Sequence, residues 1–189
     1  MRLKGYDYSR PGAFFVTICV QDRECVLGDV VGDRMELSDC GHVAHDLWED
    51  IPVRFSTVTI RVFVVMPNHV HAVIVIHPDG YPVCRGAVSA PPRSGFRRRG
   101  VVSTPHDSVE TTPSRGSTLG RVIAYYKYRT TKRINAIHGT PGARFWQRGY
   151  YDRIIRSEGE MAAICRYVID NPRLWAVDDN NPSREGQDL

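Results

Sequence analysis

Two histidines separated by one residue are the clearest candidates for metal chemistry in this sequence. His69 and His71 open an apolar, β-branched stretch that is predicted to be a strand. Side chains two residues apart on a strand point to the same face, so this spacing places two imidazoles side by side. Two imidazoles can hold one divalent cation and leave positions for a third ligand, water or a substrate oxygen. Taken alone, the pair also fits one histidine in a structural hydrogen bond and the other exposed to solvent.

A tyrosine and an asparagine four residues apart form a second candidate pair. Tyr167 and Asn171 lie in the segment RYVIDNP, at the end of a predicted helix. Residues at this spacing share one face of a helix. A tyrosine hydroxyl there could act as a nucleophile beside an amide oxygen that binds a metal. Taken alone, a core position is the better interpretation of Tyr167, and a helix-capping position before Pro172 is the better interpretation of Asn171.

Other residues compete for these roles. Tyr150 and Tyr151 are alternative nucleophiles, but they lie in a predicted strand without an adjacent metal-ligand candidate. His42 and His45 are three residues apart on a predicted helix and could form another metal pair. A solvent-facing helical pair is the better interpretation of these two histidines.

Apolar periodicity and turn signals predict the elements that position these side chains. In chain order they are a strand at 13–20, a hairpin at 28–37, a helix from Ser38 or Asp39 to about residue 50, paired strands at 58–65 and 69–76, a helix at 118–139, a strand with a glycine bend at 145–155, and a helix at 158–169. Pro52 is expected to end the first helix. Without the hairpin and the last helix, the order is the βαββαβ of an α+β, ferredoxin-like or RRM-like fold, with an antiparallel sheet and helices on one face.

The length and composition favour one globular domain. The chain has 189 residues, of which 42% are hydrophobic, and residues 1–177 are expected to form the domain. A basic, flexible insertion is expected at 78–117 and a polar tail at 178–189. The longest apolar runs fall far short of the ~20 residues that cross a bilayer, so no membrane partner is expected. Five cysteines without a CxxC pair are expected to be free thiols in a cytoplasmic protein.

Positive charge is concentrated in the middle of the chain. The net charge is only +4, but between residues 80 and 151 the basic residues are opposed only by Asp107 and Glu110. This stretch could hold nucleic acid through phosphate contacts and base stacking. The candidate phosphate contacts are Arg121, Lys127, Arg129, Lys132, Arg133 and Arg148, and the candidate stacking residues are Tyr125, Tyr126, Tyr128, Trp146 and Tyr150. The alternative is a solvated basic face over aromatic core residues, with Tyr126 facing the core.

Four ordered segments together resemble a known family. They are MPNHVHAVI, LGRVIAYYKYRTTKRIN, GTPGARFWQRGYYDRIIRSEGE and YVIDNPRLW. With them the chain, from residue 12 to 175 without the insertion, is similar to the single-tyrosine HUH transposases, specifically the REP-associated tyrosine transposases. The resemblance implies that His69, His71 and Asn171 bind a divalent metal, Mg²⁺ or Mn²⁺, and that Tyr167, on a C-terminal helix, attacks DNA. Insertion-sequence relatives usually carry glutamine in place of Asn171.

The resemblance also implies a function in DNA transposition. The chain would be a metal-dependent single-stranded DNA endonuclease and strand transferase, which cleaves beside hairpin-forming, REP-like repeats through a 5′-phosphotyrosine. The REP-associated branch implies a monomer, whereas insertion-sequence relatives form dimers in which one subunit's tyrosine helix can complete the other's site.

Two other functions are compatible with the same pattern. A noncatalytic RRM-like module would bind single-stranded nucleic acid on its sheet, but it leaves HVH and YxxxN unexplained. A metal-dependent phosphodiesterase would use an activated water and would form no covalent adduct.

Overall fold

The computed structural model describes residues 8, 10–79 and 118–186, so residues 80–117 of the predicted insertion lie outside the described part. Its main sheet is antiparallel, with strand order β4-β5-β1-β6. The strands are β1 (Gly12–Cys19), β4 (Val58–Val65), β5 (His69–Ile76) and β6 (Tyr151–Ile155). With helix α1 after β1 and α2 after β5, this is the predicted ferredoxin-like topology, which is confirmed. No helix within the described ranges is long and apolar enough to cross a membrane.

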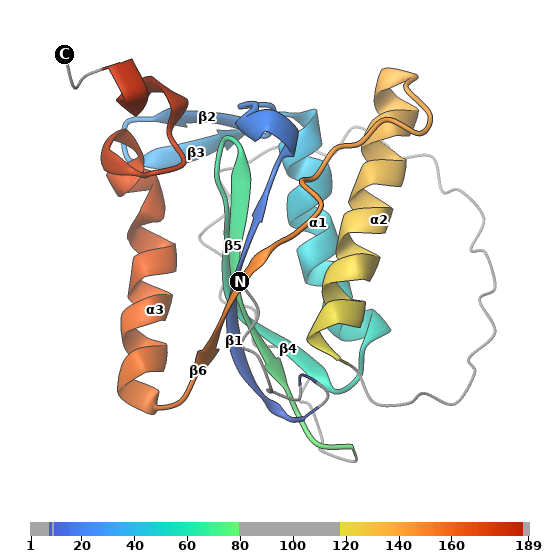
Figure 1. Ribbon diagram of the computed structural model, residues 1–189, viewed down its shortest axis with the longest axis vertical. Coiled ribbons are helices and arrows are strands. Elements are labelled where there is room, and N and C mark those ends of the chain that lie inside the picture. Colours follow the sequence, from blue (N-terminus) through green and yellow to red (C-terminus); the bar gives the residue numbers. More distant parts are fainter. Residues whose placement is uncertain (1–7, 9, 80–117, 187–189) are drawn as a thin grey trace, which may run out of the picture.

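Three helices cover the two faces of the sheet unequally. Helices α1 (Asp39–Arg54) and α2 (Leu119–His138) lie on one side, and α3 (Glu158–Asp170) lies on the other (Figure 1). The chain then continues into a 3-10 helix, Asn171–Val177, and another at Pro182–Gly186. The helix that carries Tyr167 therefore lies across the sheet from the two helices of the βαββαβ unit.

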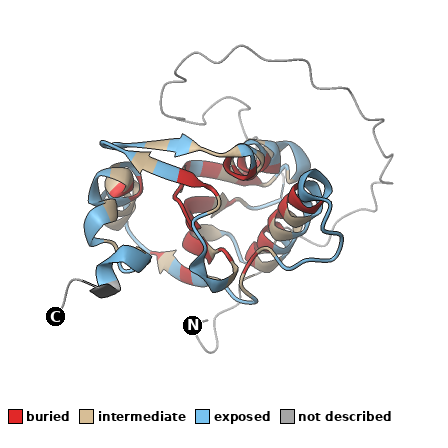
Figure 2. Ribbon diagram, turned by 90° about the horizontal axis from the view of Figure 1, so that it is seen from above, coloured by how far each residue is buried: buried red, intermediate tan, exposed pale blue. Residues whose placement is uncertain are grey.

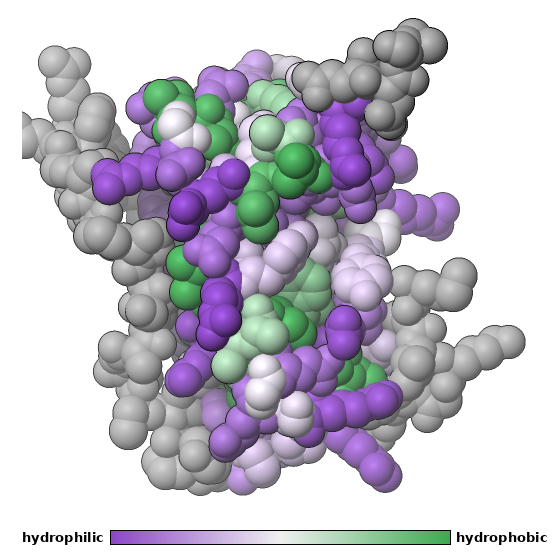
Figure 3. Space-filling view, turned by 90° about the vertical axis from the view of Figure 1, so that its left-hand side faces the viewer, coloured by the Kyte–Doolittle hydropathy of each residue, from purple (hydrophilic) through white to green (hydrophobic). Residues whose placement is uncertain are grey.

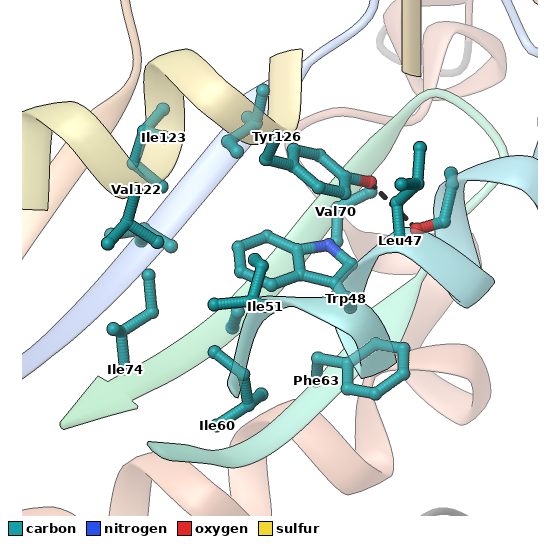
Figure 4. Close-up of a cluster of buried hydrophobic side chains, with 14 of the residues drawn as sticks. Leu47, Trp48, Ile51, Ile60, Phe63, Val70, Ile74, Val122, Ile123 and Tyr126 are labelled. Atoms are coloured by element: carbon teal, nitrogen blue, oxygen red, sulfur yellow. Dashed lines mark hydrogen bonds between the residues drawn. The ribbon is translucent and has the colours of Figure 1, made fainter. Parts of the chain in front are cut away.

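The larger core lies between the sheet and helices α1 and α2. Figure 2 shows buried residues on the inward sides of these elements. Trp48 of α1 stacks on Tyr126 of α2 with ring centroids 4.3 Å apart, and the Tyr126 hydroxyl donates to the Ala44 carbonyl (Figure 4). Tyr126 is fully buried, as the alternative interpretation of the aromatic residues expected. Side chains of this size stabilise the fold by about 1.5–3 kcal/mol each when fully buried.

A smaller apolar cluster lies between the sheet and α3. Phe15, Val62, Val73 and Ile155 of the sheet pack with Val168 of α3. Along β1, Phe15 and its alternate neighbours face α3, whereas Phe14 and its alternate neighbours belong to the larger core. Because both faces are covered, the central strands are nearly continuous apolar runs.

Helix α1 begins as the sequence predicts but does not end there. The Ser38 side chain accepts a hydrogen bond from the Gly41 backbone N–H at 3.1 Å and caps the helix. The prediction that Pro52 ends the helix is wrong, because α1 continues to Arg54 and the Phe55 N–H still donates to the Ile51 carbonyl at 2.8 Å. Proline lacks one N–H donor, and so close to the C-terminus the helix loses a single hydrogen bond.

The predicted strand at 145–155 is shorter in the structure. Only Tyr151–Ile155 forms β6, and the preceding part contributes one isolated bridge, between Trp146 and Val20. The Lys127 ammonium donates to the backbone carbonyls of Gln147, Arg148 and Gly149. A helix side chain therefore binds the carbonyl groups that a longer strand would present to a neighbour.

The predicted hairpin is confirmed and supports the turn before β5. Strands β2 (Gly28–Val31) and β3 (Arg34–Leu37) pair with each other. Directly before β2, the Leu27 N–H donates to the carbonyl of Pro67, in the turn before β5, at 2.9 Å. A Cβ atom on Gly41 would come within 2.0 Å of the Leu27 carbonyl oxygen, so this close approach requires glycine.

Candidate active site

The structure brings His69 and His71 together at the beginning of β5. Their side chains are buried, and their Nε2 atoms are 3.0 Å apart. His71 lies opposite Thr17 and His69 opposite Cys19 in the pairing of β5 with β1. Directly paired residues share a face of the sheet, so both imidazoles lie on the α3 side. The strand spacing predicted that the two imidazoles share one face, but not which face of the sheet it is.

Each imidazole has a polar neighbour at its other nitrogen. His69 Nδ1 lies 2.8 Å from the Asn68 side-chain oxygen, which can only accept, so Nδ1 carries the proton and Nε2 has a free lone pair. His71 Nδ1 lies 2.9 Å from the Thr17 hydroxyl, which can donate or accept. When Thr17 accepts, both Nε2 lone pairs point into one small space. That tautomer is the one suited to a shared cation.

Burial keeps both imidazoles neutral. The pKa of His69 is lowered to about 3, mainly by burial and in addition by the positive charge of Arg23. Burial also lowers the pKa of His71 to about 3, with His69 acting in the same direction and the Asp178 carboxylate opposing it. Neutral imidazole is the form that binds metal ions, so the pair is ready to bind one at neutral pH.

Asp178 is a third candidate ligand, which the sequence did not reveal. One ligand atom from each of His69, His71 and Asp178 lies within 4.8 Å of the others. Asp178 belongs to the segment predicted as a polar tail, 178–189. The carbonyl of Asn180 accepts a hydrogen bond from the Asn68 side chain at 2.7 Å. Because Asn68 also contacts His69, the Asn68 side chain holds both the His69 imidazole and the segment that contains Asp178 and Asn180.

Tyr167 lies beside the histidine pair. Its ring centroid is 5.5 Å from that of His71, and 42% of the residue remains exposed. Burial raises the pKa of the Tyr167 hydroxyl, the Asp178 carboxylate raises it further, and the nearby Asn171 amide opposes both. The hydroxyl is therefore protonated at pH 7 and accessible to a substrate.

Asn171 is fully buried where α3 ends, one helical turn after Tyr167. Neither polar atom of its side chain makes a hydrogen bond of good geometry. A buried amide without a partner costs about 1–3 kcal/mol, and the interaction of Asn171 with the Tyr167 hydroxyl offsets part of that cost. Asn171, Tyr167 and Asp178 line one pocket of about 250 Å³, together with Leu174, Val177, Asp179 and Asn180.

This pocket opens on the α3 side of the molecule. Figure 3 shows hydrophobic side chains exposed among hydrophilic ones on that side. Among the pocket residues, Leu174 is 44% and Val177 63% exposed. The site therefore combines buried metal-ligand candidates with an open, partly apolar entrance.

The residues predicted to contact DNA separate into two groups. Lys127 is half-buried and bound to backbone carbonyls, and Trp146 is buried with its indole N–H donated to Thr130 at 2.6 Å. Tyr150 packs partly against the larger core. The remaining predicted phosphate contacts are exposed on or beside α2: Arg121, Arg129, Lys132, Arg133 and Arg148.

The competing candidates lie elsewhere or are less well placed. Tyr151 lies opposite Thr17, on the same face as the histidines, but β1 separates it from His71. His45 forms a cluster with Asp46 and Glu49 on α1, on the other side of the sheet, and its ring contacts Phe63 with centroids 5.0 Å apart. Tyr167 has a ring contact with His71, whereas Tyr151 contacts the ring of Phe15.

Comparison with other proteins identifies a relative over nearly the whole chain. No family model matches the sequence. An uncharacterized protein of Haemophilus influenzae (strain ATCC 51907 / DSM 11121 / KW20 / Rd) is 33% identical over 180 residues, which cover 94% of this chain and 89% of that protein. Identity at this level and coverage places both chains in one family.

Two solved structures are similar to the fold. One is a REP-associated tyrosine transposase bound to a REP hairpin, with 14% identity, a TM-score of 0.48, and coverage of 98% of this chain and 75% of that one. The other is a candidate transposase from Deinococcus radiodurans R1, with 17% identity, a TM-score of 0.44, and coverage of 91% and 97%.

Proposed function

We propose that this chain, which belongs to the same family as the Haemophilus influenzae protein, is a metal-dependent, single-tyrosine DNA nuclease and strand transferase. One observation carries the proposal: two neutral imidazoles with Nε2 atoms 3.0 Å apart lie beside an accessible tyrosine ring, 5.5 Å from the second histidine. The motif resemblance to single-tyrosine HUH transposases supplies the substrate, single-stranded DNA with REP-like hairpins.

The donor set fits a divalent cation. His69 and His71 would bind it through Nε2 and Asp178 through a carboxylate oxygen. The Asn171 amide lines the pocket that Asp178 also lines. Mixed nitrogen and oxygen ligands suit Mn²⁺ better than Mg²⁺, which prefers oxygen. When bound, such an ion neutralises charge on a phosphate and stabilises a leaving oxygen. Asn68 and Thr17 are positioning residues, because they orient the two imidazoles.

Tyr167 supplies the nucleophile. Its phenolic oxygen attacks the phosphorus and the bond from phosphorus to the 3′ oxygen breaks, which leaves a 5′-phosphotyrosine and a free 3′-OH. The phenolic proton passes to water and the leaving oxygen takes up a proton, so no further reactant is needed. A second 3′-OH can attack the phosphotyrosine and rejoin strands without ATP, because the phosphodiester bond energy is conserved.

A covalent-adduct assay tests this proposal. A hairpin oligonucleotide carrying a label at its 5′ or its 3′ end is incubated with protein and Mn²⁺ or Mg²⁺. We expect only the 3′ label to remain on the protein, and we expect Tyr167→Phe to form no adduct while Tyr151→Phe forms it normally. Tight binding without any wild-type adduct would contradict the proposal. Cleavage that survives Tyr167→Phe without an adduct would indicate the water-activated phosphodiesterase.

The RRM-like alternative is less compatible with the sheet. RRM domains bind RNA on an exposed sheet face through aromatic side chains. Here α1 and α2 cover one face, and on the other Val168 of α3 packs with Phe15 and Val73. Nucleic acid would therefore have to bind at the end of the sheet or on the helices.

A further inference from the structure

A second pocket, of about 770 Å³, lies between the C-terminal half of α2 and the segment that follows it. Figure 1 shows this segment running from the end of α2 back to β6. The lining includes two aromatic and three cationic side chains: Tyr128, Phe145, Lys132, Arg144 and Arg148. We call this pocket the α2 groove. Its volume is within the range of small-ligand sites, enough for about one or two unstacked nucleotides.

Hydrogen bonds from α2 hold both ends of the groove's outer wall. At one end, the largely buried Asn135 side chain donates to the Ala143 carbonyl at 2.8 Å. At the other, Lys127 donates to the carbonyls of residues 147–149. The floor is held by the hydrogen bond from the Trp146 indole to Thr130. The groove is therefore pre-formed, which reduces the entropic cost of binding a ligand.

The charge around the α2 groove is of one sign. From Thr118 to Tyr151 the sequence contains no aspartate or glutamate. The lining cations Lys132, Arg144 and Arg148 are exposed. Tyr128, which is 63% exposed, offers an aromatic face, and the partly buried Phe145 lines the same groove. Cations beside accessible aromatic rings are the combination that binds a single strand, through phosphates and stacked bases.

The α2 groove is connected to the candidate active site. The Gln147 N–H donates to the Cys19 carbonyl at 2.9 Å, and Cys19 pairs with His69 across the sheet. Both pockets therefore adjoin the same end of β1, one on the α2 side and the other on the α3 side. A strand held in one pocket could continue to the other around that end.

We propose that the α2 groove binds an unpaired segment of the same DNA strand that is cleaved at Tyr167. Bases stack on Tyr128 and Phe145, while phosphates contact Lys132, Arg144 and Arg148. The nature of the strand as DNA rests on the proposed function, whereas the groove itself rests on its own lining. Duplex DNA is excluded, because its bases are already stacked and do not enter a pocket of this size.

Binding of a fluorescent single-stranded oligonucleotide, followed by anisotropy in EDTA, tests the phosphate contacts. The double variant Lys132→Gln/Arg144→Gln is compared with Arg34→Gln/Arg54→Gln, which removes the same charge from exposed positions on β3 and α1, outside the groove. We expect the groove variant to bind at least about tenfold more weakly and its salt slope to fall by about 0.7 per lost contact. Equal losses in the two variants would overturn the proposal.

An oligonucleotide with 2-aminopurine tests the stacking. Its fluorescence should be quenched on binding to the wild type, and Tyr128→Leu should remove most of the quenching and weaken binding at least about fivefold. If Tyr128→Leu quenches the fluorescence as much as the wild type at every labelled position, the proposal that bases enter the groove is wrong. Binding of a duplex of the same sequence should be weakened no more by the groove variant than by the charge-matched control variant.

The outcomes separate this inference from the proposed function. A normal adduct at Tyr167 together with wild-type binding by the groove variants would overturn the groove alone. Weaker binding by the groove variants, together with no adduct in the wild type, would overturn the nuclease and support the groove.

Discussion

The two faces of the sheet differ in the side chains that they bury. On the α1 and α2 side, large side chains such as Trp48 and Tyr126 fill a continuous apolar core. On the α3 side, a small cluster around Phe15 adjoins buried polar residues, among them Thr17, His71 and Asn171. One face therefore buries the larger part of the apolar core, whereas the other combines a small apolar cluster with the buried polar groups of the proposed site.

Truncation in the larger core should have the largest effect on stability. We expect Trp48→Ala to lower the free energy of unfolding by about 3–5 kcal/mol, because it removes a fully buried ring between two helices. Urea denaturation measures the loss. A decrease below 1 kcal/mol would show that the α1 and α2 side is not the main source of stability.

Removal of one imidazole should mainly affect metal binding. We expect His71→Ala to weaken Mn²⁺ binding by at least about 100-fold, measured by calorimetry, because a buried ligand is lost. His45→Ala, on the other side of the sheet, serves as the control and should bind Mn²⁺ like the wild type. Equal Mn²⁺ affinity in both variants would show that the metal does not bind on the α3 side.

The pH dependence of stability should come from the same two histidines. Their pKa in the folded protein is about 3, below the usual 6.5, so the unfolded chain binds more protons between these values. Stability without metal should therefore fall as the pH decreases below 6.5, by about 2 kcal/mol from pH 6 to 5 for both groups together. Denaturation in EDTA measures this loss. The variant His69→Gln/His71→Gln should lose most of the dependence, and an unchanged profile would contradict the assignment.

Asp178 should contribute less than an imidazole, because it is partly exposed. We expect Asp178→Asn to weaken Mn²⁺ binding about tenfold. Asp179→Asn changes the neighbouring carboxyl group, which lines the pocket but lies outside the histidine cluster. Its affinity should match the wild type, and the same loss in both variants would point to general electrostatics.

Loss of the Tyr167 hydroxyl should have the smallest effect on stability. We expect Tyr167→Phe to change the free energy of unfolding by less than about 0.5 kcal/mol, because the residue is partly exposed. Thermal denaturation and Mn²⁺ titration should both resemble the wild type. A large destabilisation would mean that Tyr167 belongs to the core, as its alternative interpretation holds.

Local patterns were sufficient for most of the fold. The strands at Val58–Val65 and His69–Ile76, and the helix from Leu119 to His138, follow the apolar periodicity and turn residues closely. One exception is local, since α1 continues past Pro52. The other involves a distant residue, because the segment before β6 has its carbonyl groups bound by Lys127, about twenty residues earlier.

The sequence by itself determined that two imidazoles share one face of a strand, because a spacing of two on a strand allows nothing else. It also placed Tyr167 and Asn171 one helical turn apart. Only the tertiary structure decided that α3 brings Tyr167 and Asn171 to the histidines, and that the segment after α3 brings Asp178 to the same place. Both depend on packing and hydrogen bonds between residues about a hundred positions apart, such as that of Asn68 with Asn180, which no local pattern encodes.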